Sequence, residues 1–227
     1  TCDLSADGAE LLTGAVDGVV KLWDLRTGRL LRVYPTGTYT VARLSPDGQQ
    51  VVTSSTREVA LWDRATATKL RTFVLPRPVW APCLAFSPQG GHLLTGGTDG
   101  VLRVWGATSL PVLELRGAPQ PIASCAWSPD GSLVAAGQTQ GEDQVVVWSV
   151  QTGQRVAQVK GGKSCAFSAD GKELVTLEDD ELVEWELRRG TQLRTRKDER
   201  GASILVQCGV APDGELMAAD AAGTIHL

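Results

Sequence analysis

Five cysteines and two histidines are the residues of this 227-residue chain that most readily bind metals or act as nucleophiles. No two cysteines form a Cys-x-x-Cys pair, and none lies near a histidine at the spacing of zinc ligands. The odd number of cysteines also argues against a disulfide framework. We therefore expect neither a metal site nor a disulfide scaffold. Five free thiols favour a reducing compartment, the cytosol or the nucleus.

The positions of the cysteines indicate a structural role. Four lie three residues before the residue that opens a turn, and one lies a place earlier. Because cysteine is among the most buried residue types, we predict small buried side chains in equivalent strands, with reactive thiols as the alternative. The five are Cys2, Cys83, Cys125, Cys165 and Cys208.

Charged side chains gather between residues 178 and 200. The carboxylates could bind a cation, and the basic residues could contact phosphate. Glu184 and Glu186 occupy alternate positions of one predicted strand, and Arg194 and Arg196 follow in the next. We favour ion pairs across an exposed outer edge, which also discourage aggregation. A net charge of −4 gives no overall field for nucleic acid, so no nucleic-acid partner is expected.

Catalysis would require an assembled nucleophile, base or metal. His92 and His226 both fall in predicted strands, and the serines lie largely in turns. We therefore predict that the chain is not an enzyme and uses no cofactor. No apolar run approaches the roughly 18 to 20 residues that cross a bilayer, so no membrane contact is expected.

A four-residue turn occurs six times along the chain. It consists of a Ser or Ala, then a Pro or Ala, then an Asp or Gln, and finally a Gly. Its glycines are 40, 42, 41, 40 and 43 residues apart. Such a turn closes a hairpin, because Pro suits its second position and Gly tolerates the left-handed conformation. The copies begin at Ser5, Ser45, Ser87, Ser128, Ser168 and Ala211.

A strand that ends in tryptophan recurs with the turn, at steps of 39, 43, 43 and 37 residues. Four short strands fit in each repeat of about 41 residues, and no helical periodicity is present. One such sheet cannot cover both of its faces, whereas sheets stacked around an axis cover one another. We therefore predict an all-β fold, a β-propeller of four-stranded antiparallel blades.

The repeats resemble the WD-repeat family over essentially the whole chain. The resemblance rests on Ser45-Pro46-Asp47-Gly48, on Leu11-Leu12-Thr13-Gly14 and on the run from Asp17 to Asp24. In this family a Trp, a Ser or Thr, an Asp and a His form a hydrogen-bonded set within each blade. The residues that match it are Thr13, Asp17 and Trp23; Thr53 and Trp62; Thr95, Asp99 and Trp105; Trp148; and Thr176, Asp179 and Trp185.

The chain departs from the family pattern in three ways. Thr56 stands at the aspartate position of the second repeat, and the fourth repeat has Ala136 and Glu142. The Gly-His pair between repeats is absent, and Gly117-Ala118 stands there before the fourth. Missing polar links should leave the blades less tightly pinned, but the fold should survive because apolar packing holds it.

We place the blades at about residues 1–36, 37–77, 78–118, 119–160 and 161–198, with an incomplete sixth at 199–227. These five and a half to six blades suggest part of a seven-bladed ring or of a tandem propeller. A self-contained six-bladed ring is the alternative.

The resemblance implies a non-catalytic scaffold for protein–protein interaction, one region of a larger multidomain protein in the cytosol or nucleus. The expected partners are proteins, including other domains of the same chain. One alternative is a regulatory or sensor region attached to a nucleotide-binding oligomerisation domain of the NACHT kind. Another is a structural module of a cytoskeletal or ciliary assembly.

Candidate partner-binding residues lie in the connections between repeats. Trp80 falls outside the repeating tryptophan position, in a Pro-rich connection that also contains Arg77. Tryptophan and arginine are enriched at binding hot spots. Tyr39 and Arg57 are similar candidates on the same predicted face. The alternative for Trp80 is packing between blades.

Overall fold

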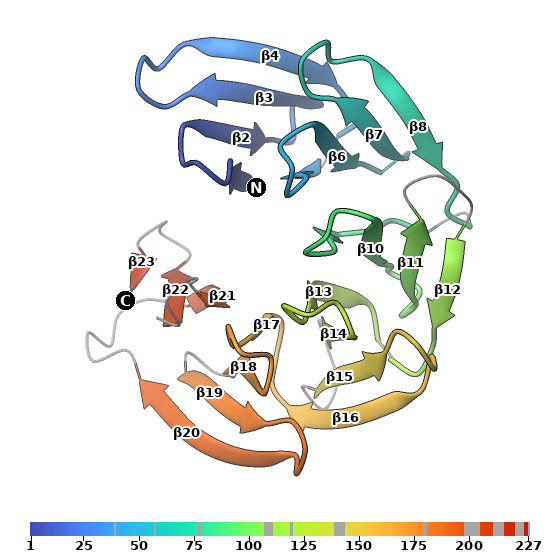
Figure 1. Cartoon of the computed structure of the whole chain (residues 1–227), viewed down its shortest axis with the longest axis vertical. Helices are drawn as coiled ribbons and strands as arrows, with labels where there is room; N and C mark the ends of the chain where they lie inside the picture. The colour runs from blue at the N-terminus through green and yellow to red at the C-terminus, as the bar shows by residue number, and fades with distance from the viewer. Residues whose placement is uncertain are drawn as a thin grey trace.

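The chain folds into antiparallel β-sheets that follow one another in sequence order around a common axis (Figure 1). The computed structural model describes residues 1–38, 40–56, 58–76, 79–106, 111–118, 120–138, 144–178, 181–197, 205–210, 216–220 and 225–226. All regular elements within these residues are strands, so none of them forms a helix that could span a membrane.

Five sheets have four strands each, and in every one the strands pair in chain order. The first contains β1 (Cys2–Leu4), β2 (Glu10–Gly14), β3 (Val19–Asp24) and β4 (Leu30–Pro35). The second contains β5 (Val41–Leu44), β6 (Gln50–Ser54), β7 (Val59–Asp63) and β8 (Lys69–Phe73). The third contains β9 (Cys83–Phe86), β10 (His92–Gly96), β11 (Leu102–Gly106) and β12 (Pro111–Leu115).

The chain continues with two more sheets of the same form and a sheet of three described strands. The fourth contains β13 (Ile122–Trp127), β14 (Leu133–Gln138), β15 (Gln144–Ser149) and β16 (Arg155–Lys160). The fifth contains β17 (Cys165–Phe167), β18 (Glu173–Glu178), β19 (Glu181–Glu186) and β20 (Thr191–Lys197). The sixth contains β21 (Leu205–Val210), β22 (Leu216–Asp220) and β23 (Ile225–His226). The predicted propeller of four-stranded antiparallel blades is confirmed; the blade boundaries remain predictions.

The recurring turn joins the first two strands of a sheet and satisfies its own polar groups. In the second sheet the Ser45 hydroxyl donates to Asp47 Oδ1 (2.6 Å) and accepts the backbone N–H of Gln50 (2.9 Å). Gly48 has a φ of 66°. The hydrogen bond from Ser45, followed by that from the Gln49 N–H, lowers the pKa of Asp47. The sequence thus fixes a rigid hairpin corner with an ionised carboxylate.

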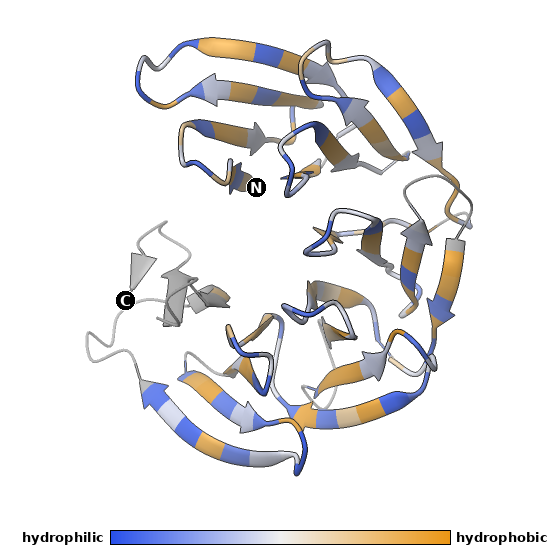
Figure 2. Ribbon diagram, viewed as in Figure 1, coloured by the Kyte–Doolittle hydropathy of each residue, from blue (hydrophilic) through white to orange (hydrophobic). Residues whose placement is uncertain are grey.

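Apolar side chains fill the space between neighbouring sheets. Tyr34 of the first sheet meets Trp62 of the second edge to face, with ring centroids 6.1 Å apart. Phe73 of the second sheet meets Trp105 of the third in the same way at 5.4 Å. Burial contributes about 25 cal/mol per Å² of apolar surface, so packing at these junctions stabilises the fold. Figure 2 shows the resulting alternation of hydrophobic and hydrophilic residues along the outer strands.

Each four-stranded sheet has a β-bulge in its outer strand, opposite the tryptophan of the neighbouring strand. One extra outer-strand residue is left unpaired at that point. In four sheets it is an aliphatic side chain that is 44–61% exposed. The five extra residues are Leu31, Leu70, Val112, Val156 and Leu193.

The cysteine prediction holds for most of the thiols but is wrong for Cys2. Cys83, Cys165 and Cys208 are buried, and Cys125 is half-buried. Cys2 is exposed, because within the described part of the chain no sheet packs against the face of β1 that carries it together with Leu4.

Candidate functional site

Four sheets contain a tryptophan–threonine hydrogen bond that links their third and second strands. In each, the indole N–H donates to the threonine hydroxyl at 2.9 Å. The pairs are Trp23 with Thr13, Trp62 with Thr53, Trp105 with Thr95, and Trp185 with Thr176. Trp148 of the fourth sheet is buried at the equivalent position, and Ala136 stands where the other sheets have threonine.

The aspartate of the predicted set has a basic partner in two sheets. Asp99 accepts two hydrogen bonds from Arg103, at 3.2 and 2.6 Å, and Arg103 also donates to Glu114 at 3.0 Å. In the first sheet Lys21 lies 3.8 Å from Asp17. Burial opposes ionisation of Asp99, but the hydrogen bonds from Arg103 and Val101 hold its pKa below the usual value. These cations contact the carboxylates that a histidine would contact in the family pattern.

Arg103 is an unusual residue for a sheet interior, since its side chain is only 2% exposed. Its guanidinium is matched by the two carboxylates of Asp99 and Glu114. Gly97 leaves the space for this pair, because a Cβ there would collide with the Asp99 carboxylate. The predicted site residue Asp179, together with Glu142, lies outside the described residues.

The connections between sheets lie on the same side of the ring as the turns between second and third strands, because the strands alternate in direction. In three places a connection is joined to such a turn, or to the strand end beside it, by residues that are 18 positions apart. The backbone N–H of Thr56 donates to the carbonyl of Thr38 (3.3 Å), and the N–H of Gln120 donates to Gln138 Oε1 (3.1 Å). In the third sheet, Trp80 and Thr98 form this link with two bonds of 3.1 and 2.8 Å. We call this side the connector face.

Trp80 is the large member of the three connector residues Thr38, Trp80 and Gln120. Its backbone is fixed by Thr98, and the next carbonyl, of Ala81, accepts the Ser54 hydroxyl at 2.6 Å. The indole is half-buried, and among the described residues its N–H is buried without an acceptor. Trp80 is thus fixed through its backbone and is half-buried as a residue, and its role in partner binding remains a prediction.

The other predicted partner-binding residues, Tyr39, Arg57 and Arg77, lie outside the described residues. The structure adds Val74 to the connector face, where its side chain is 79% exposed just after β8. The sequence signal that was missed is the 18-residue spacing, which pairs Thr38 with Thr56, Trp80 with Thr98 and Gln120 with Gln138.

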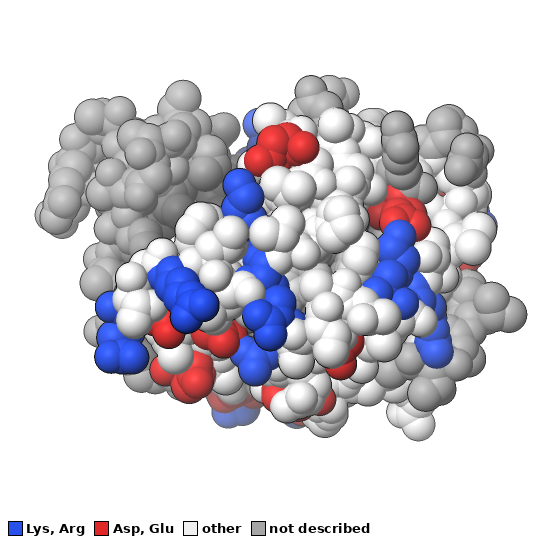
Figure 3. Space-filling view, turned by 90° about the horizontal axis from the view of Figure 1, so that it is seen from above, with Lys and Arg blue, Asp and Glu red and all other residues white. Residues whose placement is uncertain are grey.

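The ion pairs predicted across an exposed outer edge of the fifth sheet are present only in part. Glu184 has a cross-strand partner, but its side chain is only 9% exposed, and Glu186 pairs instead with Arg189 of the turn at 3.9 Å. Glu184 lies opposite Arg194, and Arg196 Nε contacts Glu184 Oε1 at 3.1 Å. Among the described residues, no three or more His, Cys, Asp or Glu side chains lie close enough to hold a metal ion. On the face shown in Figure 3, basic and acidic side chains are interspersed, which gives no continuous patch of one sign.

The buried thiols follow one another along the first strands of adjacent sheets. Ser124 and Cys165 are 3.5 Å apart, and the Cys208 thiol donates to Ser164 at 3.4 Å. Burial raises the pKa of Cys165 to about 12 and that of Cys208 to about 11. These groups stay protonated at neutral pH, so they are poor nucleophiles.

The sheets, their tryptophan–threonine bonds and their turns together define a WD-repeat β-propeller, and the chain belongs to the WD-repeat family. The sequence model of the family described as "WD domain, G-beta repeat" matches residues 1–24, 71–106 and 109–149. Such propellers are scaffolds for protein–protein interaction and are generally non-catalytic.

The chain is similar to several known proteins. It is 31% identical over 158 residues to WD repeat-containing protein SL1-17 of Schistosoma mansoni, which covers 68% of this chain and 51% of that protein. It is 30% identical over 123 residues to the serine-threonine kinase receptor-associated protein of Dictyostelium discoideum, covering 54% and 41%. It is 31% identical over 189 residues to telomerase protein component 1 of Rattus norvegicus, covering 79% and 7%. The chain thus spans about half or less of the length of these relatives.

Proposed function

We propose that this chain is a non-catalytic binding platform for protein partners, that it forms one region of a larger cytosolic or nuclear multidomain protein, and that it binds through its connector face. The names of two relatives support association as the activity, since one is a receptor-associated protein and the other a component of telomerase. No catalytic group is assembled on this face among the described residues.

The two ends of the ring differ in how their polar groups are used. At the end opposite the connector face, the hairpin turns repeat one pattern and bind their own carboxylates, as Ser128 binds Asp130 at 2.6 Å. The connections on the other end differ from one another in length and sequence. Selectivity for a partner resides in segments that vary on a rigid frame, so the connector face is the better candidate.

Trp80 is the observation that carries this proposal. In each of these connections the connector residue makes the link with its backbone, so the link itself does not require an indole. The partly exposed ring is an addition at this position, next to the exposed Thr98. Tryptophan is enriched among the residues that dominate binding energy.

Affinity capture with the purified chain tests the proposal. Proteins captured by the wild type are quantified against Trp80→Ala and Arg77→Ala, and each candidate is then purified and titrated. Val156→Ala, which truncates an exposed aliphatic residue on the outer rim, is the matched control. We expect Trp80→Ala to weaken the partner by about tenfold or more and Val156→Ala to leave it unchanged. Equal affinity for Trp80→Ala and wild type would exclude this surface.

A further inference from the structure

In each of the first four sheets, the side chain at one equivalent position of the outer strand packs against the tryptophan of the next sheet. Tyr34 and Phe73 do so as aromatic edges against Trp62 and Trp105. In the next two junctions, aliphatic side chains share a cluster with the tryptophan. These are Leu115 with Trp148 and Val159 with Trp185.

Register places Arg196 at this position in the fifth sheet. Tyr34 lies opposite Val20, and Arg196 lies opposite Leu182 at the corresponding point of the strand pair. Glu184 lies on the same face of the fifth sheet as Arg196, two residues after Leu182 on β19. At the position equivalent to Glu184, each of the first four sheets has an apolar residue that is at most 4% exposed. Those residues are Leu22, Leu61, Val104 and Val147.

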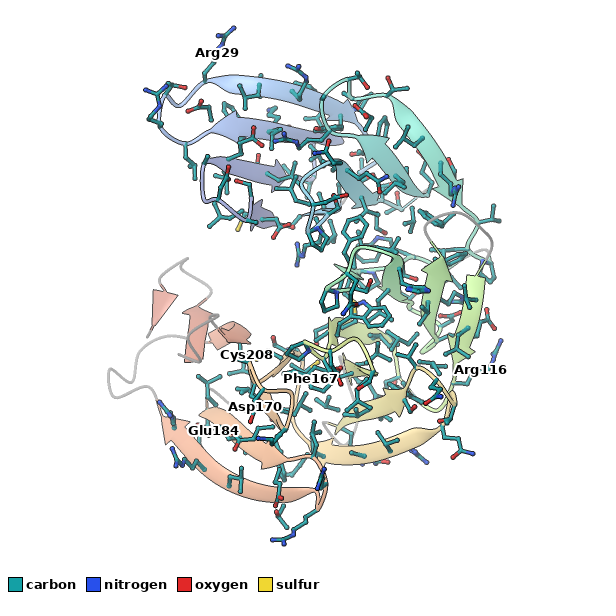
Figure 4. The ribbon with its side chains drawn as sticks, in the orientation of Figure 1. Arg29, Arg116, Phe167, Asp170, Glu184 and Cys208 are labelled. Atoms are coloured by element: carbon teal, nitrogen blue, oxygen red, sulfur yellow. The ribbon has the colours of Figure 1, made fainter. Side chains whose placement is uncertain are left out.

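The charged pair faces the sixth sheet. Val183 and Trp185 pack against the fourth sheet, so the alternate residues Leu182 and Glu184 point the other way. Leu182 indeed shares a cluster with Cys208 of β21. Figure 4 labels Glu184 on β19 and Cys208 on β21, on the neighbouring sheets.

An ion pair at this position is expected to weaken the junction between the two sheets. The Glu184 side chain is only 9% exposed and has lost most of its hydration, whereas Arg196 is 56% exposed, so the cost of desolvation falls mainly on Glu184 and the ion pair restores part of it. Apolar residues of similar volume at a buried ion pair are often more stable than the pair, because the charges cost desolvation. We propose that the buried Glu184 makes the seam between the fifth and sixth sheets partly polar, and that this junction opens more readily than the junctions among the first five sheets. This inference is independent of the connector face.

Hydrogen exchange read by mass spectrometry tests the seam. In the wild type we expect the amides of β21 and β22 to exchange about ten times faster than those of β9 and β10, or more. Replacing the pair with Glu184→Val and Arg196→Leu should slow exchange in β21 and β22 by about tenfold and leave β5 to β8 unchanged.

Two controls keep the test decisive. The double variant Glu186→Val and Arg189→Leu removes a more exposed pair at the turn end of the same strands, and it should not slow the sixth sheet. Glu184→Gln keeps the volume but removes the charge that Arg196 needs, so it should speed exchange in β21 and β22. Equal wild-type rates in the third and sixth sheets, or no slowing in the apolar variant, would overturn the proposal.

Discussion

A residue with a positive φ angle closes the turn between third and fourth strands. It is glycine at Gly28 (67°), Gly153 (69°) and Gly190 (62°), and alanine at Ala67 (55°). The N–H of each donates to the carbonyl four residues earlier, as Gly28 does to Asp24 at 2.8 Å. A side chain is strained in this conformation, so the second sheet tolerates a cost that the other three avoid.

Gly28→Ala measures that cost without a steric clash. Nothing lies within 4 Å of the position that a Cβ would take at Gly28. We expect a loss of about 1 kcal/mol in the free energy of unfolding, from the left-handed conformation alone. The control is Gly91→Ala, where the space is equally open and φ is not positive. Urea unfolding of both variants gives the comparison; equal losses would show that backbone strain is not the cause.

At the scale of the strand, the β-bulges in the outer strands hinder pairing of these edges with strands of other molecules. The bulge opposite each tryptophan interrupts the regular pattern of backbone groups that another edge would need for pairing. The exposed aliphatic side chains at the bulges, such as Val112 and Val156, work against this protection.

Val112→Lys combined with Val156→Lys should suppress self-association without changing the fold. Both side chains are more than half exposed, so we expect the free energy of unfolding to change by less than about 0.5 kcal/mol. Lysine at an edge discourages strand pairing, so light scattering on heating should rise more slowly than in wild type. The control is Val112→Thr with Val156→Thr, which removes apolar surface without charge. Unchanged scattering in the lysine variant would contradict the role given to these edges.

The regular parts of this fold could be predicted from sequence because each has a local cause. A serine, an aspartate and a glycine determine the Ser45–Gly48 hairpin through bonds within the turn itself. The bulges could not be predicted, because they depend on pairing between β-strands. Arg103 could not be predicted as a buried residue, because the acceptors that make its burial possible come from a turn and from another strand.

Of the candidate site, the sequence indicated Trp80 but not the link that fixes its backbone. That link comes from Thr98, which lies 18 residues away and contacts the connection only in the folded chain. The exposure of Cys2 escaped prediction for a related reason, since equivalent strands differ in whether a neighbouring sheet covers them.

For the whole molecule, the number of thiols that react with a reagent reports whether the packing between sheets is intact. We expect only Cys2 to react rapidly with a thiol reagent at pH 8. Cys83 is buried, a hydrogen bond with Cys83 raises the pKa of Cys125, and burial raises the pKa of Cys165 to about 12 and that of Cys208 to about 11. Intact mass should show one fast adduct on the native chain and five in denaturant. Cys2→Ser should remove the fast adduct and leave the rest. Rapid labelling of a second thiol in the native chain would show that the sheets open more often than their packing allows.

The contact between each tryptophan and the preceding sheet also makes tryptophan fluorescence a local probe of the junction between the two sheets. Trp62 lies against Tyr34 and Trp105 against Phe73, so each indole senses the junction before it as well as its own sheet. A set of proteins that each retain one of these tryptophans would emit light from one known junction at a time. Unfolding followed by fluorescence would then give the order in which the ring comes apart.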